Sequence, residues 1–132
     1  MRLWHIDLIP YLPKSQLLAQ WRELNSIFKK QDKHILINYI YNYDKRYLLN
    51  YSQSVMREML KRGYQIKSYL NYQLYFLHVD SLGIERFTEH NLTYLTICYY
   101  NLQEKYIRGQ KDFSYEQMKD LTKFYKEQMK HE

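Results

Sequence analysis

Apolar side chains recur every three or four residues over most of this 132-residue chain, which is the spacing of one face of an α-helix. The clearest case follows Pro13, because proline suits the first position of a helix, where its missing N–H is not needed. The apolar stripe behind it consists of Leu17, Leu18, Trp21, Leu24 and Phe28. We therefore expect a first helix that begins at Pro13 and buries Trp21 in a core.

The opposite side of this helix, at 100° per residue, carries smaller and charged side chains. They are Ala19, Arg22, Glu23 and Ser26, with Gln16 near the edge of the group. The helix is therefore expected to present the adjacent Arg22–Glu23 pair away from the core.

A second helix is expected from the cap residue Asp44 to Arg62. Its end is marked by the sequence KRG at 61–63, since cations complement the carbonyl end of a helix and glycine accepts the left-handed conformation. The buried face of this helix is expected to comprise Leu48, Tyr51, Val55 and Met59.

Two further helices are indicated in the C-terminal third. One is expected from about Asn91 to Tyr106, and Ser114 with Gln117 has the pattern of a capping box that opens the other. Their inward residues are expected to be Leu92, Leu95, Tyr99, Leu102 and Tyr106 in the first, and Met118, Leu121 and Tyr125 in the second.

Two stretches, 34–43 and 64–89, lack a decisive pattern. The segment Ile35–Tyr43 fits a buried strand, an extension of the first helix or irregular chain. No repeat, low-complexity tract or Gly/Ser linker divides the sequence. The expected fold class is all-α, a compact single-domain helical bundle over residues 1–132 with irregular connecting segments.

The charge balance favours a polyanionic partner. Twenty Lys and Arg residues against fourteen Asp and Glu give a net charge of +6, and nucleic acid is the usual partner of such a chain. An ordinary basic surface with no such partner gives the same balance.

The only cysteine, Cys98, excludes an internal disulfide and fits a reducing cytoplasm. Asp7, Pro10 and Pro13 interrupt the first apolar stretch, so no signal peptide is expected. No uncharged run approaches the roughly 18 apolar residues of a membrane span. We expect a soluble, cytoplasmic monomer that makes no contact with a membrane.

Several classes of site can be set aside. Three isolated glycines exclude a glycine-rich phosphate loop, and the five histidines lack the His-Glu-x-x-His spacing of zinc enzymes. We therefore expect neither a metal ion nor an organic cofactor. The pattern alone indicates a basic helical domain for which nucleic acid is one candidate partner.

Two segments carry more information than their periodicity. The first is Gln16–Leu24, with the sequence QLLAQWREL, and the second is Leu60–Ile66, with the sequence LKRGYQI. In their order and spacing they resemble, respectively, the first helix and the end of the second helix in the pyrimidine-dimer DNA glycosylase family, whose phage member is endonuclease V. The resemblance covers residues 1 to about 105, with a gap near 35–43 relative to the phage enzyme.

The first thirteen residues, MRLWHIDLIPYLP, are closer to a bacterial branch of that family. The chain also resembles this branch in two later groups of residues. They are His34 with Asn38-Tyr39, and Glu89-His90 with Tyr94-Leu95, Cys98 and Asn101-Leu102.

This resemblance implies an all-helical fold and a DNA-repair reaction on damaged duplex DNA, with no cofactor. In the family the α-amine of the first residue attacks C1′ of the damaged nucleotide, the base leaves, an imine forms, and β-elimination cuts the strand. Glu23 matches the glutamate that this reaction needs on the first helix. A carboxylate there can stabilise the developing sugar cation and then transfer protons.

The resemblance also places the nucleophile. Arg2 occupies the position of the arginine that follows the family's nucleophile, so Met1 falls on the nucleophile itself. A bulky Arg2 is also expected to block removal of Met1 by aminopeptidase. An α-amine ordinarily has a pKa near 8, so a useful fraction is unprotonated at neutral pH.

The remaining candidates would contact duplex DNA. Arg2 and Arg22 are candidate phosphate ligands. His34 and His90 are candidates for binding DNA or ordering the site, and ordinary core or surface histidines are the alternative. The other candidate contacts are Lys33, Asn101 and Lys105.

The chain also departs from the family pattern. Gln16 replaces a histidine, Ser26 replaces an arginine, and Asn101 lies near the position of another arginine. These changes weaken the expectation of specificity for pyrimidine dimers more than that of cleavage at abasic sites. The alternatives are a module that binds distorted DNA without cleaving it, and a helical protein-interaction domain.

Overall fold

The computed structural model describes residues 1–80, 83 and 86–130, and every regular element in them is helical. There are five α-helices: α1 (Lys14–Lys30), α2 (Lys45–Lys61), α3 (Tyr69–Tyr75), α4 (Leu92–Ile107) and α5 (Tyr115–Met129). Two short 3₁₀ helices, η1 (Ile6–Tyr11) and η2 (Asn38–Asn42), complete the elements. The expected all-α class is therefore confirmed.

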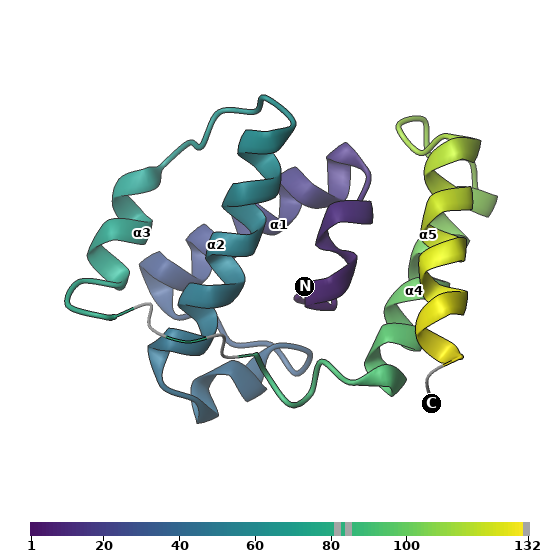
Figure 1. Ribbon diagram of the computed structural model, residues 1–132. Coiled ribbons are helices and arrows are strands. Elements are labelled where there is room, and N and C mark those ends of the chain that lie inside the picture. Colours follow the sequence, from purple (N-terminus) through teal and green to yellow (C-terminus); the bar gives the residue numbers. More distant parts are fainter. Residues whose placement is uncertain (81–82, 84–85, 131–132) are drawn as a thin grey trace.

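The helices form two groups with the N-terminal segment between them (Figure 1). In one group α1 packs against α2 and α3, and in the other α4 packs against α5. The 3₁₀ helix η1 contacts both α2 and α5, and so joins the groups. The first residues of the chain therefore lie inside the fold rather than at its edge.

The predicted second helix is confirmed as α2. The carboxylate of its N-cap residue, Asp44, accepts the N–H of Arg46 at 2.9 Å. At the other end Gly63 has a φ of 83°, the left-handed conformation expected of a glycine that ends a helix. Its predicted inward residues are all buried: Leu48, Tyr51, Val55 and Met59.

The two C-terminal helices also follow their local signals. The Asn91 side chain accepts the N–H of Tyr94 at 2.9 Å and so caps α4. Ser114 and Gln117 form the predicted capping box of α5, with hydrogen bonds of 2.7 and 3.1 Å. Local side-chain chemistry therefore determines where these helices begin.

The structure corrects the start of α1 by one residue. Pro13 is the N-cap, with φ −59° and an extended ψ of 158°, and the helix begins at Lys14. The carbonyl of Pro13 accepts the N–H of Leu17 at 3.0 Å. Proline can take this position because the N-cap residue needs no N–H of its own.

The two stretches without a decisive pattern contain short elements. Residues 35–37 form a turn that leads into η2, so this part of the chain is neither a strand nor an extension of α1. The second stretch contains α3, in which Leu70 and Leu74 are both 62% exposed. Apolar residues lie on several sides of this helix, since Tyr72 and Tyr75 pack against the core while Leu70 and Leu74 face solvent, so no single stripe marks it in the sequence.

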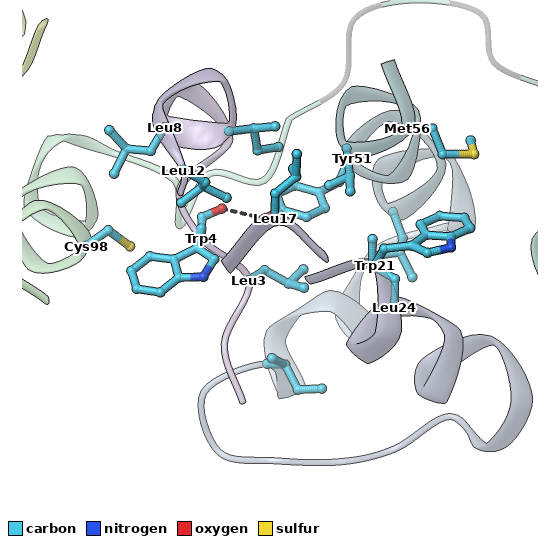
Figure 2. Close-up of a cluster of buried hydrophobic side chains, with 14 of the residues drawn as sticks. Leu3, Trp4, Leu8, Leu12, Leu17, Trp21, Leu24, Tyr51, Met56 and Cys98 are labelled. Carbon is cyan, nitrogen blue, oxygen red and sulfur yellow. Dashed lines mark hydrogen bonds between the residues drawn. The ribbon is translucent and has the colours of Figure 1, made fainter. Parts of the chain in front are cut away.

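The backbone of Trp4 is held by two buried side chains. Its N–H donates to Gln20 Oε1 at 2.8 Å, and its carbonyl accepts the hydroxyl of Tyr51 at 2.6 Å. Figure 2 shows this second bond among the packed side chains of the core. Trp4 is thereby attached to α1 through Gln20 and to α2 through Tyr51.

Two more bonds attach the same segment to the second group of helices. The hydroxyl of Tyr94, on α4, donates to the carbonyl of Leu3. The N–H of Ile6 donates to Nδ1 of His90, which lies just before α4, at 3.1 Å. Residues 3–6 are therefore hydrogen-bonded to both groups of helices.

Replacing Tyr51 by phenylalanine tests this attachment. Tyr51→Phe keeps the ring but leaves the buried carbonyl of Trp4 without its partner. We expect the free energy of unfolding in urea to fall by about 1–3 kcal/mol. The control is Tyr100→Phe, at a side chain that is 53% exposed and should not alter stability. Equal stability of both variants would show that the Tyr51 hydroxyl does not hold the N-terminal segment.

Candidate active site

Glu23 lies half-buried in the second half of α1, close to the N-terminus of the chain. Burial raises the pKa of its carboxyl, while the positive charges of the N-terminal amine and of Arg22 oppose the rise. An effect of the amine on the pKa of Glu23 requires that the two groups lie near each other. Gln20 also donates both to the carbonyl of Arg2 and to Glu23 Oε2, so Met1 and Glu23, the two residues predicted to be catalytic, lie in the same part of the fold.

The environment of Glu23 differs from the solvent-facing position expected of it. The N-terminal segment packs along the side of α1 that carries Gln20 and Glu23, so this side is only partly open to solvent. Arg22, the neighbour of Glu23, is exposed as expected. The expectation failed for Glu23 because helical periodicity does not indicate where a distant segment packs.

Gln20 is the main residue of the site that sequence reasoning missed. It is 1% exposed, and its Nε2 donates to the carbonyl of Arg2 at 3.1 Å and to Glu23 Oε2 at 3.3 Å. The spacing of three residues between Gln20 and Glu23 places them on neighbouring turns, which is the only sequence signal of this contact. Gln20 thus connects the start of the chain to the candidate catalytic carboxylate.

The N-terminal residue itself borders solvent, since Met1 is 37% exposed. Arg2 is half-buried, and its guanidinium carbon lies 5.9 Å from the centroid of the Trp4 ring. Arg2 also opposes the effect of burial on the pKa values of Tyr94 and Cys98, both of which are raised. Arg2 therefore lies near Tyr94 and Cys98 of α4, next to a residue that borders solvent.

His90 lies beneath the N-terminal segment and is buried, with 6% of its surface exposed. Its Nδ1 accepts the N–H of Ile6, so in the neutral ring Nε2 carries the proton and donates to the Tyr39 hydroxyl at 2.7 Å. Burial, followed by the charges of His5 and Arg86, lowers the pKa of His90 to about 3. With both nitrogens engaged inside the protein, His90 fits the ordering role and not direct contact with DNA.

The other candidate contacts lie around this centre. Lys33 and His34 are exposed and follow the end of α1, and the Nδ1 of His34 accepts the N–H of Leu36 at 3.1 Å. Asn101 and Lys105 are half-buried on α4, where the amide of Asn101 donates to the carbonyl of Ile97 at 2.8 Å. Nothing bonds these four residues to Met1 or Glu23 within the described part of the chain.

Positions in the sequence give the separations of two cations along their helices. Lys105 lies eleven residues beyond Tyr94, which holds Leu3, and this separation corresponds to about 16 Å along α4. Lys30, the last residue of α1, lies about 10 Å along that helix from Glu23. These two cations therefore lie several turns along their helices from Glu23 and Tyr94.

The described residues lack two features, a cluster of metal ligands and a membrane-spanning helix. Residues 1–80, 83 and 86–130 contain no group of three or more His, Cys, Asp or Glu side chains that could hold a metal ion. In the same ranges no helix has the length and hydropathy needed to cross a membrane.

A surface pocket of about 800 Å³ between η1, α2 and α5 includes neither Met1 nor Glu23, and is separate from the site.

The lowered pKa of His90 predicts a loss of stability in acid. Between its ordinary pKa of 6.5 and its pKa of about 3 in the folded protein, the unfolded chain binds a proton that the folded chain does not. Stability is therefore fully present above pH 6.5 and falls as the pH decreases. From pH 7.5 to 5 the loss from His90 should be roughly 2 kcal/mol.

Urea unfolding of His90→Gln at the two pH values measures this contribution. Glutamine can still accept from Ile6 and donate to Tyr39, so we expect a folded variant with a smaller acid loss than the wild type. His5, whose pKa is also lowered by burial, adds an acid loss to both proteins. The matched change at the exposed His78, His78→Gln, should leave the acid loss as it is. An acid loss equal in wild type and His90→Gln would contradict the assignment.

Comparison with known proteins extends this picture. No curated protein and no solved structure matches the chain. The family model described as "Pyrimidine dimer DNA glycosylase" matches residues 1–71, more than half of the chain, and this match includes Met1, Gln20, Glu23 and Tyr51. The chain therefore belongs to the pyrimidine dimer DNA glycosylase family.

Proposed function

We propose that this protein is a DNA glycosylase and abasic-site lyase that uses the α-amine of Met1 as its nucleophile and Glu23 as its catalytic carboxylate. The observation that carries the proposal is the pair of contacts made by Gln20 Nε2, which donates both to the carbonyl of Arg2, the residue after Met1, and to Glu23 Oε2. The family membership supports damaged DNA as the substrate. We propose pyrimidine dimers or related lesions in duplex DNA as its targets.

The proposed reaction begins when the lone pair of the amine forms a bond to C1′ of the damaged nucleotide. The bond between C1′ and the base breaks, and the base leaves with the bonding electrons. The sugar then opens to an imine between C1′ and the amine nitrogen. Loss of a proton from C2′ expels the 3′ phosphate by β-elimination and cuts the strand.

Glu23 would act on the charges that form in these steps. As a carboxylate it would stabilise the cationic sugar, and afterwards it would carry protons from the amine and from C2′. Partial burial favours this second task, because it brings the pKa of the carboxyl nearer to neutral pH. The Met1 amine would need a flipped-out nucleotide to reach C1′, which a buried base pair does not allow.

The proposed DNA-binding face surrounds this centre. Arg2 and Arg22 are proposed to contact phosphates beside the reacting nucleotide, while Lys33 and His34 would contact the duplex beyond the end of α1. Asn101 and Lys105 are proposed to contact it from α4. His90 is proposed to hold the N-terminal segment in place through Ile6, and thereby to help position the amine.

The alternative is a protein of the same fold that binds distorted DNA without cleaving it. The departures at Gln16, Ser26 and Asn101 favour weaker recognition of the lesion, but they leave Met1 and Glu23 in place. Cleavage separates the two functions. Both differ from a protein-interaction domain in that duplex binding should weaken steeply as salt rises.

Borohydride trapping on a duplex with one abasic site tests the proposal. An amine nucleophile passes through an imine, and reduction of this imine should give a stable protein–DNA adduct. Mass spectrometry of the adduct should place the link on the N-terminal peptide. Strand cleavage with no adduct would mean a hydrolytic reaction, and binding with no cleavage would mean the alternative function.

Replacing the carboxylate tests the role of Glu23. Glu23→Gln keeps the shape of the side chain but can neither balance a cation nor accept a proton. We expect cleavage of the abasic duplex to slow by about 10²–10⁴, with little change in duplex binding. The control is Glu127→Gln, at an exposed glutamate on α5. If Glu23→Gln cleaves as fast as this control, Glu23 is an ordinary surface residue.

A further inference from the structure

The amide of Gln20 makes three hydrogen bonds and one further close contact. Its Nε2 donates to the carbonyl of Arg2 at 3.1 Å and to Glu23 Oε2 at 3.3 Å. Its Oε1 accepts the N–H of Trp4 at 2.8 Å and lies 2.9 Å from the hydroxyl of Tyr51. The Tyr51 proton is donated to the Trp4 carbonyl, so three of these contacts are hydrogen bonds. They engage both N–H groups and one lone pair of the amide, and so fix the orientation of the side chain.

The contacts of Gln20 limit where the N-terminal amine can lie. Two of these contacts hold the chain near its start, one at the carbonyl of Arg2 and one at the N–H of Trp4. Arg2 is the residue next to Met1, so the amine is tethered at about one residue's length from an anchored carbonyl. The contact with Glu23 Oε2 belongs to the same amide nitrogen. The buried Gln20 side chain thus holds both Glu23 and the residue next to Met1.

We propose that Gln20 is a positioning residue, which sets the separation between the Met1 amine and the Glu23 carboxylate by bonding to Arg2 and to Glu23 with one nitrogen. Its consequence for catalysis rests on the function proposed above. Gln20 is 1% exposed and does not touch the substrate. It acts by geometry, since a misplacement of about 1 Å can slow a positioned reaction about 100-fold.

The effect of the amine charge on the pKa of the Glu23 carboxyl provides a readout of the separation between the two groups. The charges that act on Glu23 are those of the N-terminal amine and of Arg22 on its own helix. The buried Tyr51 of α2 is uncharged, because burial raises its pKa. Acetylation removes the charge of the amine alone. In the wild type, Nα-acetylation should therefore raise the pKa of Glu23, measured by NMR titration of its carboxyl carbon.

The variant Gln20→Met removes the amide and keeps an unbranched side chain of similar length. We expect acetylation to change the pKa of Glu23 by less than half as much in this variant as in the wild type. The control is Asn25→Leu, which removes another buried amide from α1; that amide bonds to Trp21 and Asn71 and has no contact with Glu23. The control should keep the full effect of acetylation. Circular dichroism identifies the temperatures at which each variant is folded.

Steady-state cleavage of an abasic duplex by unacetylated protein gives the catalytic consequence. We expect kcat of Gln20→Met to fall about 100-fold with KM unchanged, and both constants of Asn25→Leu to match the wild type. A purely structural role of Gln20 would lower stability in both variants alike and leave the acetylation effect and kcat unaltered. That result would overturn the proposal.

The two measurements separate the inference from the proposed function. If the wild type neither cleaves nor traps DNA, the proposed function fails, whereas the acetylation effect still tests whether Gln20 positions the two groups. If the wild type cleaves and Gln20→Met retains both the acetylation effect and kcat, the function stands and the inference fails.

Discussion

The hydrogen bonds on the backbone of Trp4 are the constraint on which the rest of the structure depends. Gln20 binds its N–H and Tyr51 binds its carbonyl, so a non-helical segment is held in the interior by side chains from α1 and α2. Buried backbone groups need such partners because no water reaches them. The same bonds bring the first residue of the chain to the middle of α1, where Glu23 lies.

The side chains that hold this segment must remain neutral. Burial raises the pKa values of Tyr51 and Tyr94, so each keeps its proton and donates it to a backbone carbonyl. Burial lowers the pKa of His90, so its Nδ1 stays free to accept from Ile6. The groups expected to do chemistry differ from these, since Met1 borders solvent and Glu23 is half-buried. The fold thus separates fixed, neutral supports from groups that can change charge.

Local chemistry allowed much of the fold to be predicted from the sequence. Asp44, Asn91 and Ser114 cap the helices that they were expected to start, because a capping side chain bonds within its own first turn. The environment of Glu23 and the role of Gln20 were not predictable in this way. Both depend on residues 2–4, whose path is set by Tyr51 and by α4 and leaves no periodic trace in the sequence.

The central claim is that the first amine of the chain, held beside Glu23, is the reacting group. One added residue ahead of Met1 would move the amine by up to about 3.5 Å and leave the anchored segment intact. The most direct measurement compares abasic-duplex cleavage by this extended protein with cleavage by a protein extended only at its C-terminus. The account predicts that the N-terminal extension abolishes cleavage but leaves salt-sensitive DNA binding, and that the C-terminal extension does neither. Equal cleavage by the two proteins would contradict it and would direct the search to a lysine.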